Sequence, residues 1–206
     1  MNTASESISF HIAYLNQKAD QILLLAGMYE KPVFVAVDGR CASGKTTLAE
    51  ILKQKGSCQV IHMDDFFLRQ SQRTPERFAE PGGNVDRERL AEEVLEPLKQ
   101  GQSALVRRMD CSVMEIKDKE TITPQGVIVI EGSYALHPEL RKYYNLSVFM
   151  DVESKDQLER IRKRNGDNKL VMFENRWIPM EEQYFSSCSV KECADLYINT
   201  SMQDEF

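Results

Sequence analysis

The stretch from residue 33 to residue 55, VFVAVDGRCASGKTTLAEILKQK, decides the fold of this chain. Its first part, VFVAV, is an unbroken apolar run without alternation, which is typical of a strand buried on both faces. Its last part, TTLAEILKQK, reads as a helix, and the glycine-containing loop from Gly39 to Thr46 lies between the two. A strand, a glycine-rich loop and a helix in this order predict the start of a parallel α/β sheet.

The loop itself reads GRCASGKT, which fits the Walker A pattern of a phosphate-binding loop. Its glycines let backbone N–H groups turn toward phosphates, and the helix N-terminus adds its positive end. Lys45 is placed to reach the terminal phosphates and Thr46 to bind Mg²⁺. A ligand-free glycine turn is the alternative, and Cys41 is interpreted as a spacer. The predicted ATP-binding residues are Gly39, Arg40, Cys41, Ala42, Ser43, Gly44, Lys45, Thr46 and Thr47.

Further apolar runs predict the remaining strands, and periodic segments between them predict helices. Helical spacing covers residues 86–100 and 154–164. Alternating strands and helices predict a three-layer α/β fold of the P-loop NTPase type with a mostly parallel sheet. The whole chain, 1–206, is then one domain. The predicted strands after the first are QVIHM (59–63), VIVI (127–130), LSVFMDV (146–152) and residues 195–200.

Two segments depart from this strand and helix alternation. Residues 103–123 alternate polar and apolar side chains, which predicts a small β-hairpin outside the main sheet. Residues 8–28 carry apolar side chains at helical spacing, which predicts an amphipathic helix within an N-terminal extension, 1–30.

Composition limits the class of protein. With 42% hydrophobic and 28% charged residues, the chain is typical of soluble globular domains. Its net charge of −6 offers no broad basic surface for nucleic acid or lipid. No apolar run is long enough to span a bilayer, and we see no signal peptide. Five scattered cysteines and three separated histidines predict reduced thiols, a cytoplasmic protein and no metal cluster of their own.

Acidic residues follow two of the predicted strands. Asp64 and Asp65 come after QVIHM, and Glu131 comes after VIVI. Parallel strands end at the same edge of the sheet as the phosphate loop, so these carboxylates are expected beside it. There they could bind Mg²⁺ and accept a proton from a hydroxyl. The alternatives are a helix N-cap for the aspartates and a surface base that pairs with Glu131.

The predicted helix 154–164 is strongly basic. Arg160 and Arg164 are four residues apart and therefore share one face, where they could hold a phosphate through forked hydrogen bonds. A solvated helix face is the alternative. Gly166 and a polar stretch follow, so residues 160–178 are predicted to form a lid over the nucleotide.

These blocks, taken in order, resemble the uridine kinase and phosphoribulokinase group of P-loop kinases. The resemblance rests on VDGRCASGKTT, HMDDFF, VIVIEGSYAL and SVFMDVESKDQLERIRKR. It implies an ATP- and Mg²⁺-dependent phosphotransferase with an alcohol acceptor. It further implies that Asp64 activates the acceptor hydroxyl and binds Mg²⁺ with Thr46 and Glu131. By the same resemblance Lys45, Arg160 and Arg164 hold phosphates, and the acceptor site contains Asp65, Phe67, Asp86 and Asp110.

The acceptor itself stays open at this stage. The resemblance favours a nucleoside such as uridine or cytidine, but Met109 and Met114 stand near the positions where uridine kinases carry a tyrosine and a histidine. Methionine offers no strong donor for reading a base, so pantothenate, glycerate or a sugar-like alcohol is the alternative. A nucleotide-switch GTPase would need NKxD, and the only NK pair, Asn168-Lys169, lacks the aspartate. A homo-oligomer is compatible with the sequence.

The segment 172–194 contains Trp177, Tyr184 and Phe185. Their spacing favours a helix packed on the sheet over a platform that stacks a base.

Overall fold

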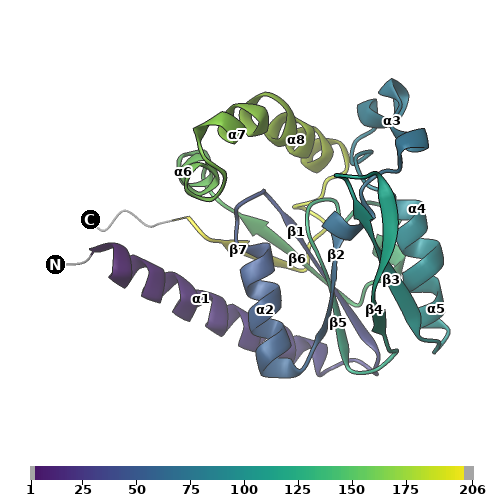
Figure 1. The fold of residues 1–206 in the computed structure, drawn as a ribbon. Coiled ribbons are helices and arrows are strands. Elements are labelled where there is room, and N and C mark those ends of the chain that lie inside the picture. Colours follow the sequence, from purple (N-terminus) through teal and green to yellow (C-terminus); the bar gives the residue numbers. More distant parts are fainter. Residues whose placement is uncertain (1–2, 202–206) are drawn as a thin grey trace.

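Five parallel strands form the central sheet of this protein, which is described from a computed structural model (Figure 1). The structure describes the backbone of residues 3–201 and the side chains of residues 11–201. The strand order is β2-β5-β1-β6-β7, so the P-loop strand β1 lies in the middle of the sheet. The predicted mostly parallel α/β sheet is therefore confirmed. The strands are β1 (Val33–Gly39), β2 (Gln59–His62), β5 (Val127–Glu131), β6 (Leu146–Asp151) and β7 (Leu196–Asn199).

The side chains of β1 divide between two cores, one on each face of the sheet. Val33, Val35 and Val37 belong to one apolar cluster, and Phe34 and Ala36 belong to the other. Successive side chains of a strand point to opposite faces, so a strand covered on both sides has no polar face. This explains the unbroken VFVAV run.

The first core lies under two helices, α1 (Thr3–Ala26) and α2 (Lys45–Gly56), which run on the same side of the sheet (Figure 1). α1 buries Leu15, Ala19, Ile22 and Ala26 completely, at the three- and four-residue spacing that places side chains on one helix face. Asp20 on α1 pairs with Lys55 on α2 at 2.6 Å. The predicted N-terminal helix is present and ends at Ala26. In the described part of the chain, no helix is both long and apolar enough to cross a membrane.

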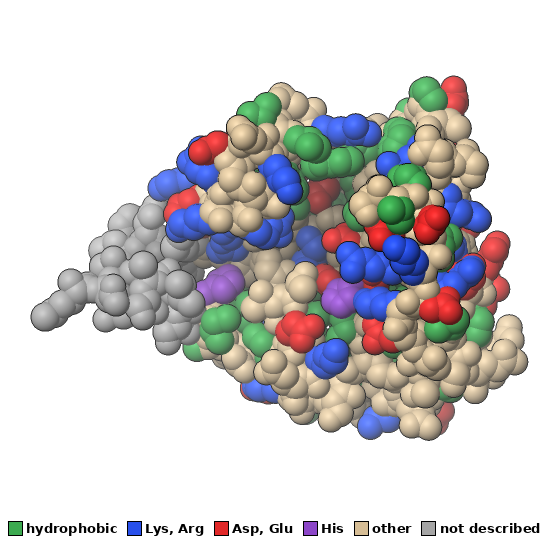
Figure 2. All heavy atoms as spheres, viewed as in Figure 1, with side chains coloured by type: hydrophobic (Ala, Val, Ile, Leu, Met, Phe, Trp, Pro, Cys, Tyr) green, Lys and Arg blue, Asp and Glu red, His purple; other side chains and the backbone are tan. Residues whose placement is uncertain are grey.

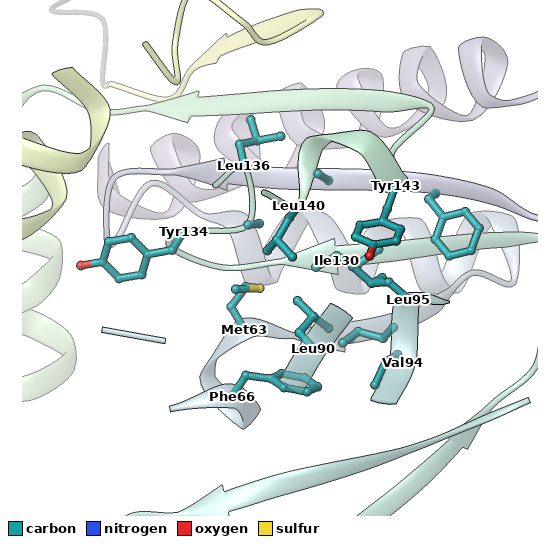
Figure 3. Packing of buried hydrophobic residues seen from close by; sticks show 14 of the residues in the cluster. Met63, Phe66, Leu90, Val94, Leu95, Ile130, Tyr134, Leu136, Leu140 and Tyr143 are labelled. Atoms are coloured by element: carbon teal, nitrogen blue, oxygen red, sulfur yellow. The ribbon is translucent and has the colours of Figure 1, made fainter. Parts of the chain in front are cut away.

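The second core is shared by the sheet, the hairpin and a run of short helical segments (Figure 3). The hairpin consists of β3 (Ala104–Asp110) and β4 (Glu115–Ile122), paired antiparallel as predicted for 103–123. α4 (Arg87–Leu90), a π-helical turn (Ala91–Leu95) and α5 (Glu96–Lys99) form one continuous stretch that matches the helix predicted over 86–100. Short 3₁₀ turns cover Met63–Phe66, Gln70–Gln72 and Arg141–Tyr143.

A chain of helices crosses above the carboxyl end of the sheet (Figure 1). α6 (Ser154–Asn165) ends at Gly166, whose φ of +79° favours glycine. α7 (Asp167–Met172), a π-helical turn (Phe173–Trp177) and α8 (Ile178–Ser187) follow, so the predicted lid, 160–178, falls on these helices. The short helix α3 (Pro75–Ala79) stands on the opposite side of the same end.

Gly39 makes a close backbone approach that no other residue permits. Its φ is +133°, and a Cβ there would lie 1.9 Å from the carbonyl oxygen of Met150 on the neighbouring strand. We therefore expect Gly39→Ala to lower the free energy of unfolding by about 3 kcal/mol or more, measured by urea denaturation. Gly126→Ala is the matched control, because Gly126 also has positive φ (+66°) but has no atom within 4 Å of the added Cβ. Equal losses in both variants would contradict the packing argument.

Candidate active site

A cavity of about 800 Å³ opens at the carboxyl end of the sheet, next to the P-loop. We call it the P-loop cleft. Figure 2 shows the hollow below the α6–α8 helices, with Lys and Arg side chains on both of its sides. Residues from the P-loop, from the ends of β2 and β5, from the lid helices and from the turn of the hairpin line it. Of the predicted site residues, the cleft brings together Cys41, Ala42, Gly44, Lys45, Thr46, Thr47, Asp64, Phe67, Glu131, Arg160 and Arg164.

Lys45 forms hydrogen bonds with the backbone of the P-loop itself. The Nζ of Lys45 donates to the carbonyl oxygens of Gly39 at 2.6 Å and Arg40 at 2.8 Å. Gly44 adopts a φ of +95° immediately before α2 begins at Lys45, which directs the first N–H groups of the helix toward the cleft. The loop thus has the geometry that receives phosphate oxygens.

Carboxylates from two other elements, β6 and α8, form ion pairs and hydrogen bonds with this loop. Arg40 pairs with Asp151 on β6 at 3.0 Å and with Glu182 on α8 at 3.1 Å. The backbone N–H of Cys41 donates to Glu181 at 2.9 Å, and Ser133 donates to the same carboxylate at 2.6 Å. Burial, and then the charge of Glu181, raises the pKa of the Cys41 thiol to about 12. A thiol that stays protonated is a poor nucleophile, in agreement with the interpretation of Cys41 as a spacer.

The acids at the strand ends meet the P-loop where the sequence predicted them. The hydroxyl of Thr46 lies 3.3 Å from Oε1 of Glu131, and the Nδ1 of His62 lies 2.5 Å from the same oxygen. The hydrogen bond to Glu131 raises the pKa of His62. The Asp64 side chain is accessible from the cleft, and its pKa is raised by desolvation and by the negative charge of Glu131. Two carboxylates and one hydroxyl therefore face one region of the cleft.

This donor set fits a hard divalent cation. Thr46, Asp64 and Glu131 offer oxygen atoms only, which Mg²⁺ prefers, and Mg²⁺ usually needs one or two carboxylates besides substrate phosphates and water. Among the described residues, no three His, Cys, Asp or Glu side chains gather closely enough to enclose a metal ion. The two carboxylates repel each other when both are ionised, and a cation between them would relieve that repulsion.

The two lid arginines differ in how firmly they are held. Arg160 donates to the Ala42 carbonyl at 3.2 Å and to the Thr200 hydroxyl at 3.0 Å, and also to the Thr200 carbonyl. Thr200 in turn donates to Ser43 at 2.9 Å, so the end of β7 positions Arg160 beside the P-loop. Arg164 lies 5.9 Å from the ring centre of Phe173.

Three of the residues predicted for the acceptor site lie outside the cleft lining, and their carboxylates are already engaged. Asp65 is buried and pairs with Lys119 of β4 at 2.6 Å. Asp86 is fully buried, caps α4 through the Arg89 N–H and pairs with Arg69 at 3.2 Å. Asp110 binds Ser112 and Lys117 within the hairpin. Of the predicted acceptor residues, Phe67 alone lines the cleft.

The interpretation of segment 172–194 holds for two of its three aromatic residues. Tyr184 and Phe185 are buried in the second core. Trp177 instead lines the cleft. It is the last residue of the π-helical turn and directly precedes α8.

Sequence reasoning missed the buried acid Asp38, at the end of β1. Its carboxylate accepts hydrogen bonds from the N–H groups of Gly39 (2.6 Å), Tyr134 (3.1 Å) and Leu136 (2.8 Å), and from the Tyr184 hydroxyl (2.8 Å). Desolvation by burial nevertheless raises the pKa of Asp38 to about 6. Tyr134 has a φ of +76° and directs its hydroxyl away from the core residues around it (Figure 3). Asp38 thus ties the P-loop, the turn after β5 and α8 together.

Removing the Tyr184 hydroxyl tests this network. We expect Tyr184→Phe to lower the free energy of unfolding by about 1.5–3 kcal/mol, because a buried carboxylate loses a donor. The hydroxyl favours the ionised carboxylate and lowers its pKa, so its loss costs more at pH 8 than at pH 5, below the pKa of about 6. Tyr144→Phe is the control: its buried hydroxyl has no hydrogen-bond partner among the described residues, and we expect little change. Urea denaturation at both pH values measures the difference, and a pH-independent loss would count against it.

The parallel sheet, the P-loop and the acids beside it define a P-loop kinase. Residues 34–169 match the model of the Phosphoribulokinase / Uridine kinase family, which is well over half of the chain. The chain belongs to this family.

Relatives of known name agree with this assignment. The uridine kinase of Clostridium perfringens is 25% identical over 186 residues, which cover 82% of this chain and 88% of that protein. Uridine kinase-like protein 4 of Arabidopsis thaliana is 28% identical over 144 residues, which cover 66% of this chain but 30% of that longer protein. The structure of "a Possible Uridine Kinase from Bacillus stearothermophilus" superposes with a TM-score of 0.67 at 22% identity, covering 93% of this chain and 98% of that one.

Proposed function

We propose that this protein transfers the γ-phosphoryl group of Mg-ATP to a hydroxyl of a small molecule. The observation that carries the proposal is the meeting of Lys45, Thr46, Asp64 and Glu131 in one cleft. A phosphate loop alone can bind a nucleotide. Phosphoryl transfer to an alcohol also needs a carboxylate that can accept the proton of the acceptor hydroxyl. Family membership supports the same reaction class.

In this proposal each residue has one task. The P-loop N–H groups and Lys45 hold the β- and γ-phosphates, and Arg160 and Arg164 contact them from the lid. Thr46, Glu131 and Asp64 would hold Mg²⁺, which neutralises phosphate charge when bound. Asp64 takes the proton from the acceptor hydroxyl while that oxygen bonds to the γ-phosphorus. The bond from this phosphorus to the β–γ bridging oxygen breaks, and ADP leaves with the electron pair.

The raised pKa of Asp64 suits such a role. A general base is more effective when its pKa lies nearer the working pH. Desolvation and the charge of Glu131 move the pKa of Asp64 in that direction, while the side chain remains accessible from the cleft.

A nucleoside is the first candidate acceptor, on the strength of the relatives named uridine kinase. The second candidate is a different small alcohol, such as glycerate, pantothenate or a sugar-like molecule. The residues near the base-reading positions favour the second. Met109 is buried in β3 rather than lining the cleft, and Met114 lies at the hairpin turn with a φ of +57°.

The test is ADP release from Mg-ATP across a panel of nucleosides, pantothenate and glycerate. At least one acceptor should stimulate turnover of the wild-type protein well above that of a Lys45→Ala variant. If no acceptor does so, the proposed reaction is wrong. The small-molecule partner, a homo-oligomeric state and a cytoplasmic location remain predictions.

A further inference from the structure

The arginines of this chain fall into two groups by their partners. Most form an ion pair with a described aspartate or glutamate within 4 Å. Arg141 does not, but it donates to the backbone oxygens of Leu136 and Cys188. The other arginines without such a pair are Arg73, Arg160, Arg164 and Arg176, and all of them line the P-loop cleft.

This gathering is not what the overall charge of the chain predicts. The net charge is −6, and acids are available to pair with nearly every arginine outside the cleft. Inside it, the acids are Asp64, Glu131 and Glu181. Glu131 and Glu181 already have partners, in His62 and in the Cys41 N–H. Unpaired guanidinium groups in a concave site attract and bind anions.

The phosphates of ATP account for some of these charges. Lys45, Arg160 and Arg164 lie at the P-loop or on α6, which follows β6. Arg73 and Arg176 lie near α3 instead. Arg73 belongs to the segment before α3, and its Nη2 lies 3.6 Å from the Sγ of Cys111 in the hairpin turn. Arg176 lies 5.4 Å from the ring centre of Phe78 on α3.

Both of these arginines are held in place without being neutralised. The Nε of Arg73 donates to the Leu68 carbonyl at 3.0 Å, which leaves the guanidinium its charge. The guanidinium group of Arg176 lies over the ring of Phe78 and also over the ring of Trp177, whose centre is 4.7 Å away. Contact with an aromatic face orients a guanidinium and leaves its N–H edge free for an anion.

We propose that the acceptor carries an anionic group, a carboxylate or a phosphate ester, and that Arg73 and Arg176 bind it. The cleft then has two anion sites, one for the nucleotide and one for the acceptor, with Asp64 lining the same cavity. An uncharged alcohol such as a free nucleoside would leave both guanidinium groups unpaired. This inference rests on the proposed function, because it describes the acceptor of that reaction.

The test uses the full chain saturated with Mg²⁺ and the non-hydrolysable analogue AMP-PNP, so that the P-loop is filled. Inorganic phosphate or glycerate is titrated at constant ionic strength, with glycerol as the uncharged counterpart, and the shift in Tm is followed. We expect a saturable rise with at least one anion and none with glycerol. In the Arg73→Gln and Arg176→Gln variants, the anion concentration that gives half of the maximal Tm shift should increase by about tenfold to a hundredfold.

Arg162→Gln is the matched control. Arg162 lies on α6 outside the cleft lining and pairs with Asp167 at 3.0 Å, so the anion response should be unchanged. No saturable response in the nucleotide-loaded wild-type protein would overturn the proposal. So would an equal response in the Arg73→Gln/Arg176→Gln double variant. A response seen only without AMP-PNP would assign the arginines to the nucleotide and overturn it as well.

Failure of the proposed function has a different signature. In that case AMP-PNP itself would produce no Tm shift that depends on Lys45. The response to phosphate compared with glycerate decides which anion the acceptor carries.

Discussion

Replacing Lys45 by alanine is expected to reduce acceptor-dependent ADP formation by about a hundredfold to a thousandfold. In the proposed reaction the ammonium group stabilises the negative charge that spreads over the γ-phosphoryl oxygens, and removing one such preorganised donor costs this much in rate. Lys45 is buried and bonded to the Gly39 and Arg40 carbonyls, so its position is fixed before a nucleotide arrives. Initial rates with saturating Mg-ATP measure the loss.

Two checks separate this effect from damage to the fold. Lys53→Ala removes a lysine from the exposed side of the same helix, α2, and should leave turnover unchanged. Urea denaturation should show that Lys45→Ala loses no more than about 1–2 kcal/mol, since two carbonyl oxygens lose one partner. A Lys45→Ala enzyme as fast as the wild type would rule out the P-loop as the site of transfer.

The elements that the sequence predicted best are those governed by local pattern. VFVAV had to be covered on both faces, and β1 is indeed buried along its length. The alternation over 103–123 predicted the hairpin, because one of its faces packs on the second core through Ala104, Val106 and Ile122. Asp64 and Glu131 were placed beside the P-loop by a topological rule on where parallel strands end.

The contacts that were not predicted join residues far apart in the chain. Asp38 binds Tyr184, and Glu181 binds the N–H of Cys41. Nothing in the local sequence around Glu181 distinguishes it from a solvated acid on a helix. Asp86 is an instructive case, because it directly precedes the helical run RERL and an aspartate there is a strong N-cap signal. The local rule accounts for its hydrogen bond to Arg89.

The same limit applies to the arginines. Sequence spacing placed Arg160 and Arg164 on one helix face, but it could not show which arginines lack a carboxylate partner. In the sequence, the hairpin and the strands β5 and β6 lie between Arg73 and Arg176. The two arginines nevertheless line one cleft, because α3 and the α7–α8 segment face each other across it. The proposal of an anionic acceptor therefore rests on the tertiary structure and not on sequence spacing.

Asp64→Asn should separate nucleotide binding from phosphoryl transfer. An asparagine of the same shape keeps an oxygen toward the cation but cannot take a proton. We expect the Kd for Mg-ATP to change by less than about threefold, while kcat falls by about a hundredfold to ten-thousandfold, the range of general base catalysis. Isothermal titration with AMP-PNP and single-turnover rates measure the two quantities. Equal loss of binding and rate would leave Asp64 with a role in metal binding alone or in the structure, and not as the base.

Asp65→Asn is the comparison that the chain offers at the adjacent position. Asp65 is buried and holds Lys119 of the hairpin at 2.6 Å, so we expect this variant to lose stability, by about 1–3 kcal/mol, and to keep more of its turnover than Asp64→Asn. A larger loss of rate in Asp65→Asn than in Asp64→Asn would exchange the roles proposed for the two residues.

The pH dependence gives a further signature of Asp64 as the base. Because desolvation and Glu131 raise its pKa in the folded protein, log kcat/KM of the wild type should rise with pH through that raised pKa and then level off. The Asn variant should lack this limb. Linkage predicts the opposite trend for stability: the folded state binds the proton more tightly, so this group's contribution falls as pH rises between its unfolded and folded pKa. Asp64→Asn should consequently be at least as stable as the wild type at neutral pH. Loss of activity without loss of stability in Asp64→Asn is the result expected of an acid that serves the reaction and not the fold.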